Sequence, residues 1–329
     1  TAVGYVSMYA NTTGAQNVAV GYAALDANTT ASNNTAIGYN SMTNNTTGTG
    51  DVAVGKDALV SNTTGSQQVA VGMSAMYSNT TGYNNTAVGW ESMKANTTGY
   101  LNVAVGQQAM LSNTTGYQNV SIGHNSSAAN TTGYSNVAVG DNALAANTTG
   151  VVNTAVGQNA LDANTTANGN TAVGYQAGTS CTTGNRLVAV GYNAAGSYTT
   201  GGYTTAIGYD SLKSATTGGS NTAVGTRSME DLTTGDVNTA VGEASMYSLT
   251  TGDYNCGFGQ CMIGLTSGSR NTAMGMNAGN DITTGLYNVV IGMSNETSGN
   301  GSNQIVIGYG VTGTGNDNFT FGNGATDSN

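Results

Sequence analysis

The side chains that could do chemistry are few, and they lie far apart in the sequence. His124 is the only histidine, and Cys181, Cys256 and Cys261 match neither a zinc-site spacing nor a disulfide framework. We interpret the histidine as a solvated surface residue and the cysteines as small packing residues, with a disulfide or redox role as the alternative. Because no Ser-His-Asp set, carboxylate pair or metal-ligand cluster is present in the sequence, we expect no enzymatic activity and no cofactor.

Two runs of tyrosines with a 17-residue spacing are candidates for a surface role. If the chain makes one coil in each interval, the rings of each run stack into an exposed strip. Exposed aromatic strips can bind sugars or partner proteins, and the alternative is cross-coil stacking that stabilises the sheet. The candidate surface-binding residues are Tyr83, Tyr100, Tyr117, Tyr134, Tyr175, Tyr192 and Tyr209.

This spacing comes from a repeat, first seen as TAVGYVSMYANTTGAQN over residues 1–17. The glycine at position 4 returns at intervals of 17 from Gly4 to Gly259, and then at intervals of 16, 17, 16 and 14 up to Gly322. A fixed period of this length indicates a repeat architecture. Three β-favouring or small residues precede each glycine. We therefore predict an all-β fold, a repetitive parallel β-solenoid with 17-residue coils.

The strand at the start of each repeat suggests how chains associate. Position 2 is nearly always Ala and position 3 is nearly always Val or Ile, and the two side chains must point to opposite faces. We expect position 3 to fill the coil and position 2 to pack against a neighbouring chain. A single thin coil gains little from burial against the entropy of its ordered backbone, which favours a trimer. The candidate trimer contacts are Ala87, Ala104 and Ala138.

Positions 5 to 17 of the repeat predict a second secondary-structure element followed by a turn. Positions 5 to 10 are expected to form a bent strand, with one helical turn as the alternative. Asn-Thr-Thr-Gly at positions 11 to 14 is a turn by composition. Asn at position 11 is expected to form an internal amide ladder, with N-glycosylation as the alternative. A second ladder is expected at position 17, from Asn17, Asn34, Asn85, Asn102, Asn119, Asn136 and Asn153.

Composition limits the partners of the chain. The net charge of −10, with only 6 Lys and Arg, disfavours nucleic acid and anionic membrane surfaces. No apolar run approaches the roughly 20 residues of a membrane helix. The regular spacing divides the chain into a repeat shaft, residues 1–298, and an irregular C-terminal cap or junction, residues 299–329. Because Thr1 already lies inside a repeat, we expect the chain to be a fragment or a processed product.

The unit NTAVGYxAMxxNTTG resembles the glycine-rich repeats of phage tail-fibre shafts. It is also similar to repeats of bacterial surface proteins, which often stand ahead of an endosialidase-type intramolecular chaperone domain. Its Val-Ala-Val-Gly core is also similar to repeats in the heads of trimeric autotransporter adhesins. The resemblance covers nearly the whole chain, from Thr1 to about Gly322. It implies a trimeric fibre on a cell or virion surface.

Three functions follow as hypotheses. The first is a structural fibre shaft of an extracellular or virion appendage, which holds or forms an attachment device. The second is an adhesin that binds carbohydrate or another surface through the tyrosine strips. The third is ice binding through threonine rows such as Thr12, Thr29, Thr46 and Thr63. Adjacent threonines in an extended chain point apart, which weakens this third hypothesis.

Overall fold

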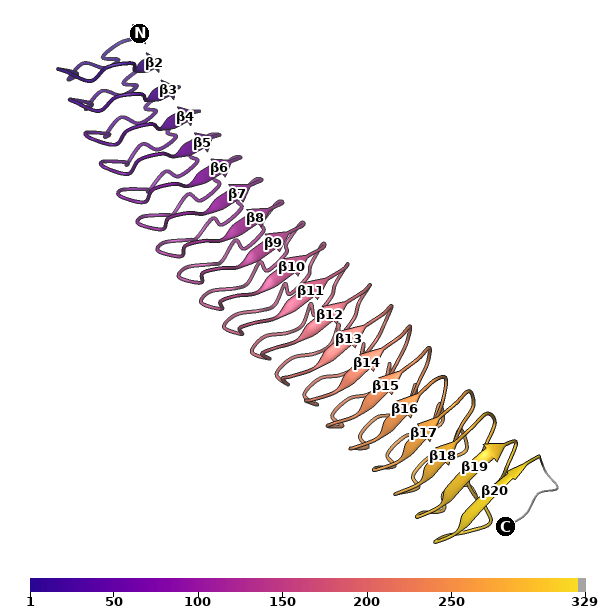
Figure 1. The fold of residues 1–329 in the computed structure, drawn as a ribbon. Helices are drawn as coiled ribbons and strands as arrows, with labels where there is room; N and C mark the ends of the chain where they lie inside the picture. The colour runs from indigo at the N-terminus through magenta and orange to yellow at the C-terminus, as the bar shows by residue number, and fades with distance from the viewer. Residues whose placement is uncertain (325–329) are drawn as a thin grey trace. The chain divides into compact units, whose positions relative to one another are not determined.

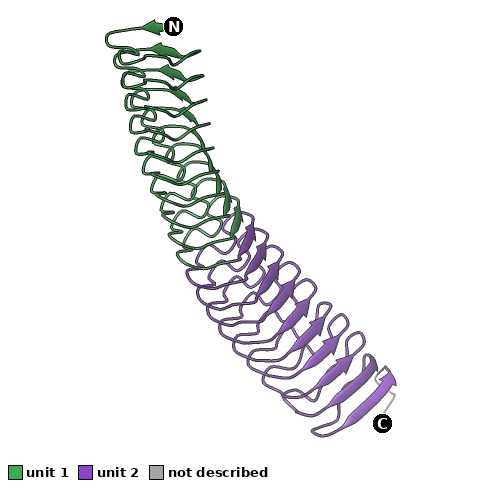
Figure 2. Cartoon of the chain, turned by 60° about the vertical axis from the view of Figure 1, so that its left-hand side comes forward, with its two compact units in different colours: residues 1–168 green, residues 169–329 purple. Residues whose placement is uncertain are grey.

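The first three residues of each repeat form a short β-strand in the computed structural model of the chain, which describes residues 1–324. The chain comprises two compact units, residues 1–168 and 169–329 (Figure 2). Unit 1 contains β1 (Ala2–Val3), β2 (Val18–Val20), β3 (Thr35–Ile37), β4 (Val52–Val54), β5 (Val69–Val71), β6 (Thr86–Val88), β7 (Val103–Val105), β8 (Val120–Ile122), β9 (Val137–Val139) and β10 (Thr154–Val156). Unit 2 contains β11 (Thr171–Val173), β12 (Val188–Val190), β13 (Thr205–Ile207), β14 (Thr222–Val224), β15 (Thr239–Val241), β16 (Cys256–Phe258), β17 (Thr272–Met274), β18 (Val289–Ile291), β19 (Ile305–Tyr309) and β20 (Phe319–Asn323).

Within each unit, every strand pairs in parallel with the strand of the next repeat (Figure 1). The register places equal repeat positions beside one another, as Ala87 beside Ala104 and Ala189 beside Ala206. The prediction of a parallel β-solenoid with 17-residue coils is therefore confirmed. No helix that could span a bilayer occurs in the part of the chain that the structure describes.

Positions 5 to 10 form a series of turns, so the prediction of a second strand there is wrong, as is the alternative of a helical turn. Positions 6 and 8 have positive φ, for example 55° at Glu91 and 51° at Met93. This alternation turns the amides of positions 6 and 8 toward opposite neighbouring coils. The Glu91 amide donates to the Met73 carbonyl at 3.0 Å, and the Met93 amide donates to the Ala109 carbonyl at 2.9 Å. Coil-to-coil hydrogen bonds therefore offset the cost of left-handed backbone in residues other than glycine.

The glycine that ends each strand is required by both conformation and space. Gly89 has a φ of 135°, a region that residues with a side chain rarely adopt. A Cβ atom at this position would lie 2.6 Å from the carbonyl carbon of Gly106 in the next coil, and closer still to its oxygen. The stacking of one glycine on another therefore explains why position 4 is Gly in every repeat.

The core lies inside each coil and contains positions 2, 7 and 8. Ala104, Ala109 and Met110 belong to one cluster and are each 0% exposed. The expected orientation of the strand is wrong, because position 2 points inward and position 3 points outward. A coil of 17 residues has a narrow interior, and a buried Met or Leu occupies position 8 in most coils. The strand can therefore contribute only a small side chain to this core.

Unit 2 keeps the same strand register despite its shorter repeats. Cys256 pairs with Thr272 and Val289 pairs with Ile305, although each pair is separated by 16 residues. The connecting segments absorb the missing residues, since the strands remain aligned. The region predicted as a cap contains β19 and β20, which pair in parallel over five residues. Its last part, residues 325–329, lies outside the described residues.

Candidate functional site

The candidate functional features are rows of equal side chains that run from coil to coil. The tyrosines at position 15, Tyr83, Tyr100, Tyr117 and Tyr134, form one stack with neighbouring ring centroids 4.8–5.0 Å apart and planes within 3–6°. The position 5 tyrosines of unit 2, Tyr175, Tyr192 and Tyr209, stack at 5.1 and 5.2 Å. A third stack of Tyr5, Tyr22 and Tyr39 was not identified from the sequence, although its 17-residue spacing gives the same signal.

The stacking determines which part of each ring a ligand can reach. Tyr83 is 45% exposed and Tyr134 is 37% exposed, so the strip lies on the surface. The faces of Tyr100 and Tyr117 are covered by the rings on either side. Sugars stack on ring faces, whereas this strip presents mainly ring edges and hydroxyl groups. Each neighbouring pair instead contributes cross-coil stabilisation of the kind measured for cross-strand pairs.

The position 17 amides form a buried ladder. The Asn85 side-chain oxygen accepts a hydrogen bond from the Asn102 backbone amide at 3.0 Å, and Asn102 does the same for Asn119. Each Nδ2 atom also donates to the position 14 carbonyl in the turn of the next coil, as Asn102 does to Gly116 at 2.8 Å. Asn17, Asn34, Asn136 and Asn153 lie in the same row with equivalent bonds. The ladder therefore fixes each turn to the coil beside it.

A second buried ladder occupies position 11 of unit 1. The Asn113 Nδ2 atom donates to Asn96 Oδ1 at 2.8 Å and to the Gly116 carbonyl at 3.1 Å. Asn113 is 0% exposed, so its amide is unavailable for a glycan in this fold. In unit 2 the same position is filled by Cys181, Tyr198, Ala215, Leu232, Leu249, Leu265 and Ile282, all 0% exposed. Amides and apolar groups therefore occupy the same inward-facing position.

Asp51 replaces asparagine in the position 17 ladder and is 0% exposed. Its backbone amide donates to Asn34, and its Oδ1 atom accepts from the Gln68 amide at 2.9 Å. Its Oδ2 atom accepts from Asn62 Nδ2 at 3.4 Å. Burial raises the pKa of the Asp51 carboxyl from 3.8 to about 7, while the Gln68 hydrogen bond lowers it by a smaller amount. The ladder therefore contains one group that changes charge near neutral pH.

The predicted trimer contacts, Ala87, Ala104 and Ala138, are each 0% exposed within a single chain. That prediction is wrong, because these side chains have no surface left for a partner. The outward-facing row of each strand is position 3. Positions 1 and 3 lie on the same side of the strand, and we call this side the strand face. Its position 3 members are Val3, Val20, Ile37, Val54, Val71, Val88, Val105, Ile122, Val139 and Val156 in unit 1, and Val173, Val190, Ile207, Val224, Val241, Phe258, Met274, Ile291, Ile307 and Phe321 in unit 2.

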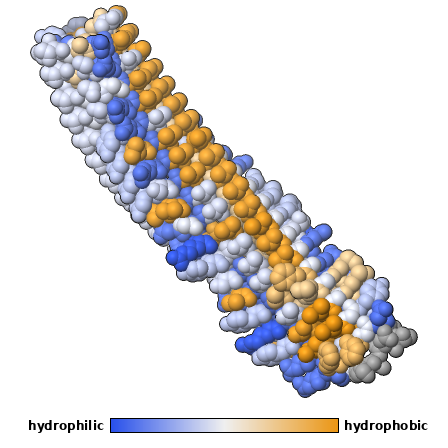
Figure 3. Space-filling view, in the orientation of Figure 1, coloured by the Kyte–Doolittle hydropathy of each residue, from blue (hydrophilic) through white to orange (hydrophobic). Residues whose placement is uncertain are grey.

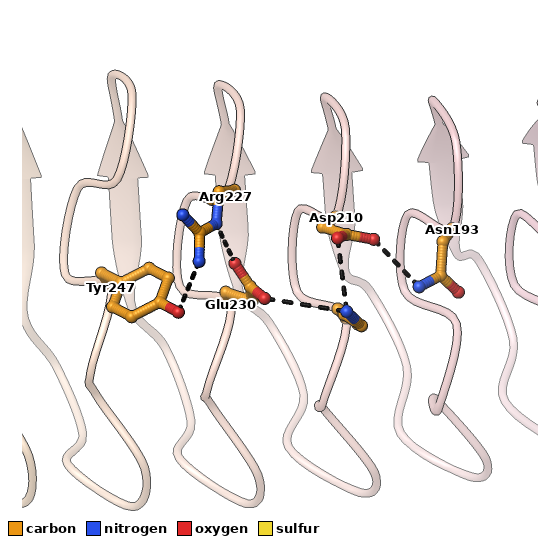
Figure 4. Close-up of polar contacts among 6 residues, drawn as sticks. Asn193, Asp210, Arg227, Glu230 and Tyr247 are labelled. Atoms are coloured by element: carbon orange, nitrogen blue, oxygen red, sulfur yellow. Dashed lines mark hydrogen bonds and ion pairs between the residues drawn. The ribbon is translucent and has the colours of Figure 1, made fainter.

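A polar network crosses the turns of unit 2 (Figure 4). Glu230 lies between the Arg227 guanidinium, with Nε 2.5 Å away, and the Lys213 ammonium, 3.8 Å away. Hydrogen bonding to Asp210 raises the pKa of Lys213. The lysine and arginine are half-exposed, and exposed ion pairs contribute little stability. The six members are Asn193, Asp210, Lys213, Arg227, Glu230 and Tyr247.

The remaining reactive side chains are His124 and the three cysteines. His124 is exposed and its Nδ1 atom is 2.9 Å from Asp141 Oδ1 in the next coil. The three cysteines are free, and burial raises the pKa of the Cys181 thiol to about 11. Burial also raises the pKa of the Cys256 and Cys261 thiols, which makes their reactive thiolate forms scarce at neutral pH. Among residues 1–324, no three His, Cys, Asp or Glu side chains gather as metal ligands would.

No protein-family model matches the chain, and no curated protein has a sequence similar to it. The features of the coils that bear on function are their rows of stacked side chains and their outward strand face.

Proposed function

We propose that the chain is a structural shaft segment of an extracellular or virion surface appendage, of the tail-fibre or adhesin kind that its repeat resembles. The observation that carries this proposal is the continuity of hydrogen bonding from coil to coil. Strands, turns and side-chain amides all bond to their neighbours, as in the Gly89 to Val71, Met93 to Ala109 and Asn102 to Gly116 bonds. A coil fixed along its whole path resists bending and stretching, which a shaft requires.

The length that the stacked coils produce is also suitable for a spacer. Ten strands at a spacing of about 4.8 Å give unit 1 alone a length of roughly 48 Å. Length in such a protein increases by whole coils, and each coil contacts only its neighbours. The function of a shaft therefore depends on the number of coils more than on any one surface residue.

Deletion of whole coils tests this proposal. Removing residues 52–136 deletes five repeats in phase, and we expect the purified chain to fold and to be shorter by about 24 Å in electron micrographs. Removing residues 52–127 breaks the phase and is expected to disrupt the ladder. Immunogold labelling with an antibody to the chain should locate it on a surface appendage of the producing cell or virion. Label confined to the cell interior, or an in-phase deletion that leaves the length unchanged, would contradict the proposal.

The tyrosine stacks give the adhesin alternative less support. Only the end rings of the first strip, Tyr83 and Tyr134, have a face that is not against another tyrosine of that strip. A glycan array is the appropriate test, with Tyr83→Ala and Tyr134→Ala compared against Tyr117→Ala. Glycan binding that is lost only in the end-ring variants would favour the adhesin function over a simple spacer.

A further inference from the structure

Position 3 of the strand face is an apolar row in both units, and position 1 beside it is Val or Thr in most repeats. Its position 3 side chains are Val, Ile, Met or Phe in all twenty strands, and many are at least 36% exposed, such as Val105 and Ile122. Neither position 1 nor position 3 of any strand carries a charge, although the chain has a net charge of −10. Figure 3 shows hydrophobic side chains gathered in columns that follow successive coils. The solvent-facing side of a sheet normally carries polar residues. An exposed apolar row of this kind is typical of an interaction surface.

The area of this face approaches that of a specific interface. Complete burial of a Val or Ile side chain removes roughly 100 Å² from water. At the exposure of Val105, 36%, each position 3 residue offers about 40 Å², and position 1 adds about 20 Å². Ten coils therefore give roughly 600 Å² on unit 1 alone, against about 800 Å² per partner in a standard interface.

The spacing of side chains along the strand face limits which partner surface can match it. Its side chains recur about every 4.8 Å, so only a surface with the same period can match it at every coil. A second copy of this chain has that period and the same apolar side chains. Two such faces would pack as two sheets about 10 Å apart, with uncharged side chains between them. The acidic residues lie at other repeat positions, so like charges do not meet across the contact.

We propose that the strand face is a self-association surface and that its partner is the strand face of a second copy of this chain. This inference does not depend on the shaft function, because it rests on the strand face alone. It places the contact between copies at the outward valines, on the opposite side of each strand from the buried alanines.

The test is the mass of the purified full chain by light scattering over a range of concentrations. The first variant is Val88→Asp, Val105→Asp and Val139→Asp together, which puts three charges on the strand face. The matched control is Thr98→Asp, Thr115→Asp and Thr149→Asp, which adds the same charge at exposed turns of the same coils. A second variant carries Val→Thr at the same three strand positions, because Thr keeps the β-branched shape.

We expect the mass of the parent chain in solution to be a multiple of 32.8 kDa. The concentration at the midpoint of association should rise about a hundredfold in the Asp variant and about tenfold in the Thr variant, with the turn control unchanged. A parent that stays at 32.8 kDa at every concentration would overturn the inference and leave the shaft proposal standing. A folded Asp variant with the parent's association would also overturn it. If the Asp variant fails to fold, parent-like association of the Thr variant decides against the inference.

Discussion

Replacing Asp51 with asparagine should stabilise the chain at neutral and alkaline pH. Asp51 is buried among the uncharged side chains of Asn34, Asn62 and Gln68, and burial raises its pKa from 3.8 to about 7. The folded chain therefore holds this proton between about pH 4 and pH 7, whereas the unfolded chain releases it. The contribution of Asp51 to stability is greatest in acid and falls as the pH rises to about 7.

The size of the effect follows from the shift in pKa. About three pKa units at 1.36 kcal/mol each correspond to roughly 4 kcal/mol lost between acid and neutral pH. The asparagine side chain of the Asp51→Asn variant has no proton to lose, and its amide can donate to the Gly65 carbonyl as Asn34 does to Gly48 at 2.8 Å. The variant should therefore lack this pH dependence and regain most of the loss above about pH 7.

Urea unfolding at about pH 5 and about pH 9 measures this difference. We expect the parent to lose more stability than Asp51→Asn between the two conditions, and the variant to be the more stable of the two at alkaline pH. Asp26→Asn is the control, since it removes a carboxylate of the same chemistry from the surface turn of a neighbouring coil. Equal pH dependence in the parent and Asp51→Asn would refute the reasoning.

Three further substitutions test individual positions of the coil. Gly89→Ala should destabilise the chain by at least about 3 kcal/mol, because the new Cβ atom meets the Gly106 carbonyl carbon at 2.6 Å and the backbone is left-handed. Asn113→Ala should cost about 1–3 kcal/mol, because Asn96 Oδ1 and Asn130 Nδ2 each lose a buried hydrogen bond of the ladder. Ser121→Ala should stabilise the chain by about 1 kcal/mol, because the buried Ser121 hydroxyl has no hydrogen-bond partner.

Urea denaturation with circular dichroism measures all three changes. Thr115→Ala is the control for Asn113→Ala, since Thr115 is an exposed residue two positions further along the same turn. An Asn113→Ala variant no less stable than this control would show that the ladder does not support the coil. A Gly89→Ala variant with parental stability, or a less stable Ser121→Ala variant, would contradict the packing described for these positions.

The period, strand position and stacked rows could be predicted from the sequence, because one fixed interval determines them all. Equal residues 17 apart lie beside one another once the chain coils. The tyrosines at position 15 therefore stack, and the position 17 amides place donors beside acceptors. These rows require only the correct period and not the path of the chain within a coil.

The direction of the strand and the path of the turns could not be predicted in the same way. Alternation shows that Ala104 and Val105 face opposite sides, but it does not show which side is inside. In the structure the smaller Ala104, and not Val105, faces the narrow interior of the coil. The positive φ of Glu91 and Met93 is also hidden in sequence, because these residue types normally signal a right-handed or extended backbone.

Distances between spin labels test the stacking of one coil per repeat most directly. Labels on cysteines introduced at Lys56 and Gln158, exposed position 5 residues six repeats apart, should lie about 29 Å apart, and labels at Tyr22 and Gln158, eight repeats apart, about 38 Å apart. The account predicts narrow distributions whose means rise in proportion to the number of repeats. Broad distributions, or means that do not increase from six repeats to eight, would contradict a solenoid with 17-residue coils.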